Sequence, residues 1–478
     1  MSHYKTGICC GLHSINSAKE DSSAKTHATE TIYIYYIKME KSIFLCAVVI
    51  FLVTGINGDH QLGHHRHAQH HRRHSHRHSL HHPNAARHNR KPHTEEVLSY
   101  HAIASNNFEF GSKLFKLVAS KPDWASKNIF FSPFSISSAF GMLSLGARFD
   151  TLTQIQEGLC FNVTDSSDTE IHQNFEEALD ALNNRTDEVH LFNGNAVFVR
   201  EGAEILPTFL DDTQRYYAAS ALSTDFKNKE EAVKQINEFV EKKTHGKIIK
   251  ALQEVDPETV VLLVSYIMFQ GTWEKPFNPK NTKEEDFFID ADTTVKVPMM
   301  YRPGVYKVFQ DSHVGCTFLE LPYKGAASLF LILPDAGKME DVVESLSFET
   351  VLKWHHSTIH RFASVSLPKF SIATSYDLKE LLIEMGIADV FSDSADLSGI
   401  TGNRDLKVSK ALHKAILDVD ETGTEAAAVT IIELTPRTAI HEQYSFNRPF
   451  LFLVCENETK MILFMGKLAN PSEISEPN

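Results

Sequence analysis

Near the C-terminus, one segment combines a protease cleavage signal with a run of small side chains. Residues 421–438 read Glu-Thr-Gly-Thr-Glu-Ala-Ala-Ala-Val-Thr-Ile-Ile-Glu-Leu-Thr-Pro-Arg-Thr. An exposed arginine suits a trypsin-like serine protease, because a buried guanidinium needs a carboxylate partner and the acidic primary pocket of such an enzyme provides one. The sequence Pro436-Arg437-Thr438 is therefore an attractive cleavage site for such a protease if it is exposed.

The residues before this bond are sorted with the period of a β-strand. Successive strand residues point to opposite faces, and one face then carries only uncharged side chains: Thr424, Ala426, Ala428, Thr430 and Ile432. Glu425 and Glu433 share the other face. The uncharged face can be buried in a sheet while the acidic face stays in water. We therefore predict two states of this segment, an exposed loop and an inserted strand.

A second chemically distinct segment, residues 59–93, is rich in histidine and arginine. It holds thirteen histidines and almost no large apolar side chain, so it cannot bury a core and is expected to be disordered when free. Neutral imidazole is the commonest ligand for nickel, zinc and copper ions. The candidate ligands are His64, His65, His67, His70, His71, His74, His76, His78, His81 and His82. The alternative is a solvated tail that binds metal only in the test tube.

Composition limits the classes of partner. The chain has 478 residues, of which 42% are hydrophobic and 23% charged, and its formal charge is -14, within the range of a globular protein. Residues 59–93 carry seven Lys and Arg and one acid. The folded part is therefore strongly acidic and is not expected to bind nucleic acid. Only the tail is a candidate for binding heparin.

The N-terminal region is expected to be removed. The apolar run 43–53 follows Met39 and is too short to span a bilayer, so residues 39–58 are predicted to be a signal peptide and residues 1–38 an upstream extension. A signal anchor that starts at Met1 is the alternative. We expect a secreted, extracellular protein without a membrane partner.

Sequons and cysteines agree with an extracellular location. Glycosylation sequons begin at Asn162, Asn184 and Asn457. The cysteines after the signal peptide are Cys160, Cys316 and Cys455. One pair of them could form a disulfide, and one thiol would then stay free or bridge to another molecule.

Residues 94–478 are predicted to form a domain of mixed secondary structure. Helical periodicity covers 98–121, 135–145 and 168–183. Strands are predicted at 188–199, 259–269, 316–322, 328–334 and 363–372, and a hairpin at 450–455 and 461–468. Because strands and helices do not alternate regularly, the pattern favours an α+β domain with large, mostly antiparallel sheets.

Motifs in this domain resemble those of the serpin family. Similar to the hinge of the reactive loop of inhibitory serpins are Glu421, Gly423, Thr424, Glu425, Ala426, Ala427 and Ala428. Other similar segments are 128–136 (NIFFSPFSI), 269–273 (FQGTW), 295–300 (VKVPMM), 367–370 (LPKF), 395–399 (ADLSG), 413–415 (HKA), 446–450 (FNRPF) and 464–467 (FMGK). The resemblance extends over residues 96–474 and is nearest to the antitrypsin-like branch. The tail resembles the histidine-rich leader of a nickel-binding serpin.

The resemblance implies a serpin fold and a suicide mechanism. The fixed spacing from the hinge places the bait bond at Arg437–Thr438, with Pro436 in the neighbouring subsite. A target protease would attack this bond, form an acyl-enzyme and be carried away as the reactive loop, about residues 421–445, inserts into the main sheet. The catalytic nucleophile belongs to the target, so we expect neither an enzyme nor a required cofactor. The expected targets are thrombin-like, kallikrein-like or trypsin enzymes, and the expected state is a monomer.

The resemblance also implies which residues control insertion. Ser132, Ser135 and His413 correspond to a buried shutter network, and Trp273 to the breach where insertion begins. Many serpins have asparagine where this chain has Ser265. The shorter hydroxyl could leave a buried partner unsatisfied, which costs about 1 to 3 kcal/mol. We interpret His413 as a hydrogen-bonding core residue and Trp273 as a packing residue.

The alternative function is that of a non-inhibitory serpin that serves as a metal- or heparin-binding carrier. Such serpins commonly have bulkier or charged hinge residues, so Ala426, Ala427 and Ala428 favour inhibition. Helix 168–183 contains no Lys or Arg. Heparin activation through this helix is therefore not expected.

Overall fold

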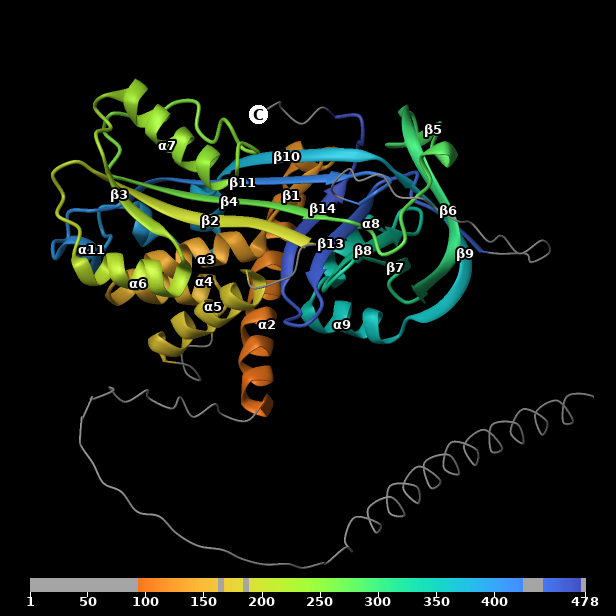
Figure 1. The fold of residues 1–478 in the computed structure, drawn as a ribbon, viewed down its shortest axis with the longest axis horizontal. Coiled ribbons are helices and arrows are strands. Elements are labelled where there is room, and N and C mark those ends of the chain that lie inside the picture. The colour runs from red at the N-terminus through yellow and green to blue at the C-terminus, as the bar shows by residue number, and fades with distance from the viewer. Residues whose placement is uncertain (1–92, 162–166, 184–188, 424–441, 474–478) are drawn as a thin grey trace, which may run out of the picture. The chain divides into compact units, whose positions relative to one another are not determined.

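The computed structural model of the protein describes residues 93–161, 167–183, 189–423 and 442–473, which are coloured in Figure 1. All of them belong to the unit formed by residues 88–478. The predicted signal peptide, the histidine-rich tail and the bait bond lie outside the described residues.

The helices predicted from periodicity are present. The helix predicted at 168–183 is α5 (Asp168–Asn183). Ser132 caps α3 (Pro133–Ser144) by accepting a hydrogen bond from the backbone N–H of Ser135, and proline suits the first helical position. The other helices are α2 (His93–Ser120), α4 (Phe149–Gly158), α6 (Pro207–Tyr217), α7 (Lys229–Lys243), α8 (Met339–Ser345), α9 (Phe348–His356), α10 (Lys379–Glu384) and α11 (Ser398–Thr401).

A five-stranded sheet crosses the domain (Figure 1). Its strands lie in the order β10 (Phe370–Asp377), β11 (Val408–Val419), β4 (Val261–Gly271), β2 (Val189–Arg200) and β3 (Ser220–Thr224). β11 and β4 are parallel, whereas β10 with β11 and β2 with β4 are antiparallel. The C-terminal ends of β4 and β11 therefore lie at the same edge. We call the contact between these two strands the seam.

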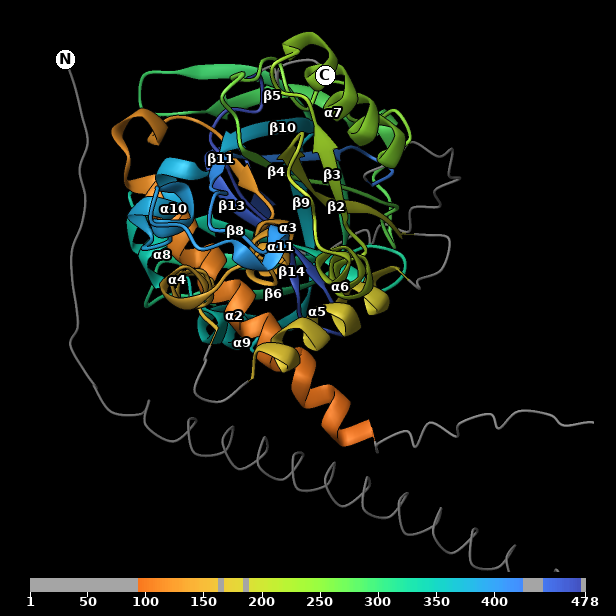
Figure 2. The ribbon, with the colours of Figure 1, turned by 90° about the vertical axis from the view of Figure 1, so that its left-hand side faces the viewer.

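Both faces of this sheet are buried, which explains why every residue of β4 is buried and most of them are apolar. Leu262 and Val264 belong to one apolar cluster, which includes residues of α7, and Leu263 and Ile267 belong to another, which includes residues of α3. Figures 1 and 2 show α7 on one side of the sheet and α3, α4 and α6 on the other. Ser265 lies between Leu263 and Ile267 in the alternation along β4, so its side chain is on the same face as theirs and faces α3.

The second sheet has nine strands among the described residues and contains the predicted hairpin. The hairpin consists of β13 (Phe450–Glu456) and β14 (Ile462–Leu468), which are antiparallel. The full order is β1 (Ile129–Phe131), β14, β13, β8 (Ala327–Pro334), β7 (Cys316–Pro322), β6 (Thr294–Asp311), β9 (Ile359–Pro368) and β12 (Glu442–Ser445), with β5 (Lys283–Phe288) paired to β6. β12 runs parallel to β9.

The prediction of a single strand at 363–372 is wrong. Lys369 separates β9 from β10, and these two strands belong to different sheets. Leu367 lies before the break and Phe370 after it, and both are buried. The apolar pattern of the sequence therefore does not indicate where one strand ends and the next begins. The backbone N–H of Lys369 donates to Pro298 O at 2.9 Å.

The three cysteines of the domain are free thiols, so the disulfide considered from the sequence does not form among Cys160, Cys316 and Cys455. Cys316 and Cys455 are buried, and Cys160 is partly exposed. Over the part of the chain that the structure describes, none of the helices is both long and apolar enough to cross a bilayer.

Candidate functional site at the end of strand β11

The chain turns sharply directly after β11, at the start of the predicted hinge. The carboxylate of Asp420 accepts hydrogen bonds from the backbone N–H groups of Thr422 (2.8 Å) and Gly423 (3.1 Å), and the Asp420 N–H donates to Gly423 O (2.8 Å). The turn lies where the seam ends. Residues 424–441, which are not described, connect it to β12.

Gly423 occupies a position that requires glycine. Its φ is +142°, and it forms a bridge with Thr272, directly after β4. A Cβ at this position would lie 2.1 Å from Gly271 O and 2.8 Å from the backbone nitrogen of Trp273. Because these are backbone atoms, they cannot move aside without disturbing β4. The hinge glycine thus lets the first residues after β11 lie against the end of β4.

Glu421 anchors the turn from the other side. Its carboxylate accepts hydrogen bonds from Thr282 Oγ1 (2.8 Å) and Lys369 Nζ (3.0 Å), and its carbonyl oxygen accepts one from the Phe277 N–H (2.8 Å). Burial alone would raise the pKa of Glu421, but the bonds from Thr282 and Lys369 lower it below its ordinary value. Glu421 is therefore charged and held in place at neutral pH.

Trp273 covers the same end of the seam. It is 1% exposed and stacks on Tyr323, with ring centroids 4.2 Å apart and an interplanar angle of 16°. Its indole N–H donates to Asp420 O (2.9 Å), and its backbone N–H donates to Thr422 O (2.8 Å). Trp273 is a packing residue, as expected from the sequence, and it also binds the turn from which residues 424–441 depart.

A buried polar cluster lies beneath the middle of the seam. The backbone N–H of Ser132 donates to His413 Nε2 (3.1 Å), so this nitrogen must be an unprotonated acceptor. The imidazole proton is then on Nδ1, which donates to Ser265 Oγ (2.8 Å). Burial lowers the pKa of His413 to about 3. The neutral imidazole thus joins both strands of the seam to the cap of α3.

The Ser265 and His413 pair looks like a nucleophile with its general base, but its surroundings exclude catalysis. Ser265 is 1% exposed and His413 is 0% exposed, so no substrate reaches either side chain. A base with a pKa of about 3 takes up no proton near neutral pH. The structure therefore agrees with the interpretation of His413 as a core hydrogen-bonding residue.

Sequence reasoning missed Asn195, which extends the cluster across the sheet. The strand register places Asn195 of β2 opposite Ser265, Ser265 opposite His413, and His413 opposite Tyr376 of β10. Asn195 Nδ2 donates to Ser138 Oγ of α3 at 2.9 Å. A polar row therefore crosses four strands above α3. An asparagine in the apolar part of β2 was the available signal in the sequence.

The sequence suggested that the short side chain of Ser265 leaves a buried partner in the shutter network unsatisfied, and one hydroxyl of that network has no partner among the described residues. Ser265 has a partner in His413, whereas the Ser135 side-chain oxygen is buried without a partner among the described residues. The Ser135 backbone N–H donates to Ser132 Oγ (3.0 Å). The expected cost of about 1 to 3 kcal/mol therefore applies at Ser135 of α3. Among the described residues, the side-chain oxygen of Asn195 in β2 is also buried without a partner.

The comparisons with known proteins agree with this geometry. A family model described as "Serpin (serine protease inhibitor)" matches residues 105–471. The chain belongs to the serpin family. The family is one of serine protease inhibitors and not of proteases.

This serpin is similar to antitrypsin-like proteins. It is 45% identical over 384 residues to "Alpha-1-antiproteinase 2" of Equus caballus, with 80% of the chain and 90% of the relative covered. It is 44% identical over 387 residues to "Alpha-1-antitrypsin" of Sus scrofa, with 81% and 91% covered.

Solved structures show the same fold as this serpin. Human thyroxine-binding globulin in complex with thyroxine is 40% identical, with a TM-score of 0.75 over 78% of the chain and all (100%) of that structure. Human glycosylated kallistatin is 39% identical, with a TM-score of 0.73 over 80% of the chain and 100% of that structure. The serpin fold predicted from the motifs is therefore confirmed.

Several predicted site residues of the serpin lie outside the described residues: Thr424, Glu425, Ala426, Ala427, Ala428, Pro436, Arg437, Thr438, Asn162, Asn184 and the tail histidines. Within the described ranges, no group of three or more His, Cys, Asp or Glu side chains could hold a metal ion. Asn457 is described and lies between β13 and β14, where its Nδ2 donates to Ser328 Oγ (3.1 Å).

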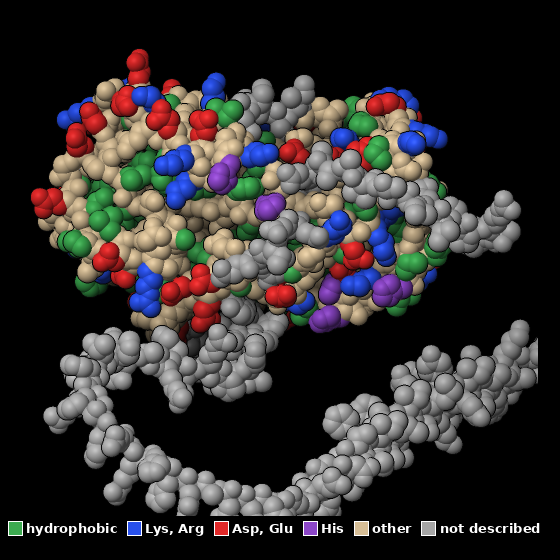
Figure 3. Space-filling model, viewed as in Figure 1, with side chains coloured by type: hydrophobic (Ala, Val, Ile, Leu, Met, Phe, Trp, Pro, Cys, Tyr) green, Lys and Arg blue, Asp and Glu red, His purple; other side chains and the backbone are tan. Residues whose placement is uncertain are grey.

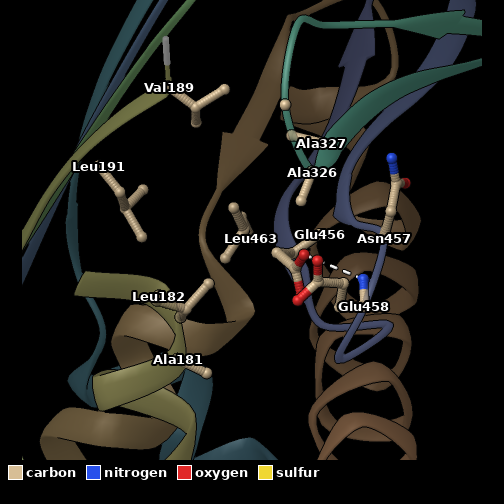
Figure 4. Close-up of a pocket in the computed structure, with 11 residues that line it drawn as sticks. Ala181, Leu182, Val189, Leu191, Ala326, Ala327, Glu456, Asn457, Glu458 and Leu463 are labelled. Atoms are coloured by element: carbon tan, nitrogen blue, oxygen red, sulfur yellow. Dashed lines mark hydrogen bonds between the residues drawn. The ribbon is translucent and has the colours of Figure 1, made fainter. Parts of the chain in front are cut away.

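A cavity of about 610 Å³ lies apart from this site, beside the end of α5, the start of β2 and the turn between β13 and β14 (Figure 4). Its lining includes Leu182, Leu191 and Leu463 as well as Glu456 and Glu458. None of the hinge, breach or shutter residues line it. On the face shown in Figure 3, basic and acidic side chains are interspersed.

Proposed function

We propose that the protein is a secreted suicide inhibitor of trypsin-like serine proteases and that its bait bond is Arg437–Thr438. The observation that carries the proposal is the pinned turn Asp420–Gly423, which starts residues 424–441 at the end of a seam between parallel strands. The membership of the serpin family supports it. The hinge alanines and Pro436 before Arg437 are the sequence features that specify inhibition and target class.

In this mechanism the serine of the target attacks the carbonyl carbon of Arg437. An acyl ester forms, the peptide bond breaks, and the amino group of Thr438 takes up a proton and leaves. Residues 424–437 then enter the seam between β4 and β11. Fully extended, these residues span roughly 46 Å at about 3.3 Å per residue, so the acylated protease is carried across the molecule.

The topology of the sheet supports insertion at the seam. Because the chain reverses at Asp420–Gly423, an entering strand would run antiparallel to both β4 and β11. One parallel ladder, which extends from Val408 opposite Val261 to Leu417 opposite Phe269, would be replaced by two antiparallel ladders. Antiparallel pairing is slightly more stable per residue. The bond between Ser265 and His413 crosses the seam and must break or rearrange during insertion.

The test is to mix the purified protein with trypsin or thrombin and to look for a complex that survives SDS. The wild type is expected to form it, and Arg437→Ala is expected to abolish it. A variant that trapped thrombin at the wild-type rate would exclude Arg437 as the bait residue. Absence of any complex with the wild type would exclude inhibition of these enzymes.

A carrier function is the second candidate, because the chain is similar in structure to thyroxine-binding globulin in complex with thyroxine. An apolar pocket lined by Phe108, Phe330, Phe348 and Ile462 has a volume of about 30 Å³, which is roughly that of one water molecule. A ligand of hormone size does not fit this pocket without rearrangement. A carrier that binds metal or heparin through the tail would form no protease complex, which separates the two functions.

We further propose that the histidine-rich tail binds nickel, zinc or copper ions. The dense spacing of His64 to His82 supports this, because neighbouring imidazoles supply overlapping sites without a fixed fold. Protons compete with the metal, so nickel affinity should be high at pH 7.5 and largely lost at pH 5, whereas heparin should bind more tightly in acid. Protein that starts at Thr94 should bind neither nickel nor heparin and should still trap the protease. If it bound nickel as tightly as the full-length protein, the metal site would lie in the folded domain and not in the tail.

Secretion and glycosylation complete the proposed function. The predicted signal peptide 39–58 and the sequons at Asn162, Asn184 and Asn457 support an extracellular glycoprotein. Expression in a eukaryotic secretory cell should release protein that lacks residues 1–58. Its mass should fall on treatment with a glycosidase that removes N-linked glycans, and unchanged mass would exclude all three sites.

A further inference from the structure

Strand β6 has one edge that is only partly paired. One edge pairs with β9 from Met299 to Val308. On the other edge, β5 pairs as far as Met299 and β7 begins at Lys307, so among the described strands none pairs with residues 300–306 on this side. Arg302 and Tyr306 lie in this gap, with Gly304 between them on the same face of the strand. A small cavity opens there.

Arg302 is an unusual cation in this gap. It is 9% exposed, and its guanidinium lies over the rings of Phe277 and Tyr306, 4.9 Å from each centroid. Its Nε donates to Tyr306 Oη (2.8 Å). Among the described residues, no carboxylate forms an ion pair with Arg302, and its two Nη atoms have no hydrogen-bond acceptor. Ring faces stabilise the charge but do not accept the N–H groups in the guanidinium plane.

The cavity beside Arg302 has a volume of about 170 Å³. Two further lysines and a histidine line it, Lys275, Lys307 and His360. Glu274 and Glu320 also line it, but both carboxylates interact with other groups. Glu274 lies 3.9 Å from Lys275 Nζ, and Glu320 accepts hydrogen bonds from Ser328 and Lys307 and lies 3.4 Å from His355 Nε2. Both lysines that line the cavity lie near a carboxylate, whereas the guanidinium of Arg302 does not pair with one among the described residues.

We propose that this cavity binds a tetrahedral oxyanion, a sulfate or phosphate group, either free or as a monoester. A buried guanidinium without a carboxylate is costly, and its planar fork matches two oxygens of such an anion. The volume equals that of about six water molecules, so a five-atom anion fits and a whole sugar chain does not. Lys275 and His360 at the rim supply further donors.

The experiment is a calorimetric titration of the full-length protein with inorganic phosphate at constant ionic strength in chloride. The wild type is expected to bind one phosphate in the folded domain. Arg302→Gln is expected to weaken binding by about tenfold or more, as loss of a charge-assisted pair of hydrogen bonds would. The matched control is Lys296→Gln, which removes an exposed cation paired with Asp286 outside the cavity and should leave the affinity unchanged.

A second variant keeps the test decisive if Arg302→Gln does not fold. Lys275→Gln removes a cation at the rim, with its side chain 62% exposed, and should weaken phosphate binding several-fold. Glucosamine 6-sulfate in place of phosphate separates the sources: equal binding indicates a monoester site, and binding of phosphate alone indicates a site for the free ion. Equal phosphate affinity of the wild type and both variants would overturn the proposal. The test is independent of protease inhibition, which Arg437→Ala addresses.

Discussion

Replacement of His413 by glutamine should remove a defined part of the acid sensitivity of the fold. In the native state the imidazole is completely buried and must stay neutral, because Nε2 accepts the N–H of Ser132 and Nδ1 donates to Ser265. Burial lowers the pKa of His413 from 6.5 to about 3. A glutamine amide offers both an acceptor and a donor and does not titrate.

The magnitude follows from the linkage between protonation and folding. In the unfolded chain His413 takes up a proton near pH 6.5, whereas in the folded chain it does so only near pH 3. The contribution of His413 to the free energy of unfolding is therefore fully present above pH 6.5 and is lost as the pH falls towards 3. Between pH 7 and pH 5 this histidine alone costs about 2 kcal/mol of unfolding free energy, and about 5 kcal/mol below pH 3. Buried His172, whose pKa burial lowers to about 4 despite Asp168, costs about 2 kcal/mol more over the first interval.

The assay is guanidinium unfolding followed by circular dichroism at pH 7 and pH 5. The two histidines should make the wild type lose about 4 kcal/mol between these pH values, and His413→Gln should lose about half of that. His313→Gln, at an exposed turn, is the control and should behave like the wild type. If His413→Gln loses as much stability as the wild type, the imidazole is not held neutral under the seam.

Three further predictions concern the hinge and its anchor. Gly423→Ala should lower the melting temperature more than Gly402→Ala. Both glycines have a positive φ, but a Cβ at Gly402 (φ +84°) would meet no atom within 4 Å, whereas a Cβ at Gly423 would clash with backbone atoms at and directly after the end of β4. Glu421→Gln should cost about 1 kcal/mol of unfolding free energy by weakening the bond from Lys369, and Lys369→Met should add little more to it in a double-mutant cycle. Ala428→Arg should turn the inhibitor into a substrate that trypsin cleaves without forming an SDS-stable complex, because insertion would bury an unpaired charge; a mostly covalent product would refute insertion.

Much of the secondary structure was predictable because amphipathic periodicity marks it. The bounds of α5 and of β7 agree with the predicted ranges 168–183 and 316–322. The break at Lys369 was not predictable, because apolar residues continue on both sides and the change of sheet depends on which distant strands each half meets. The hinge glycine and glutamate were found from the motif, but the reason for each emerged only from contacts with Gly271, Thr282 and Lys369.

The sequence by itself is enough to predict the bait chemistry proposed for this protein: a hinge of small residues, an alternating face without charge, and an arginine at a bond that a trypsin-like protease could cleave. Those properties reside in consecutive residues and need no partner to be recognised. Tertiary structure alone decided the neutral tautomer of His413, whose partner Ser265 is 148 positions away, and the place of Asn195 in the same row. It also decided the isolation of Arg302 between two rings. Such contacts follow from the register of strands that are distant in the chain. That register depends on which faces the strands bury together and not on neighbouring residues alone.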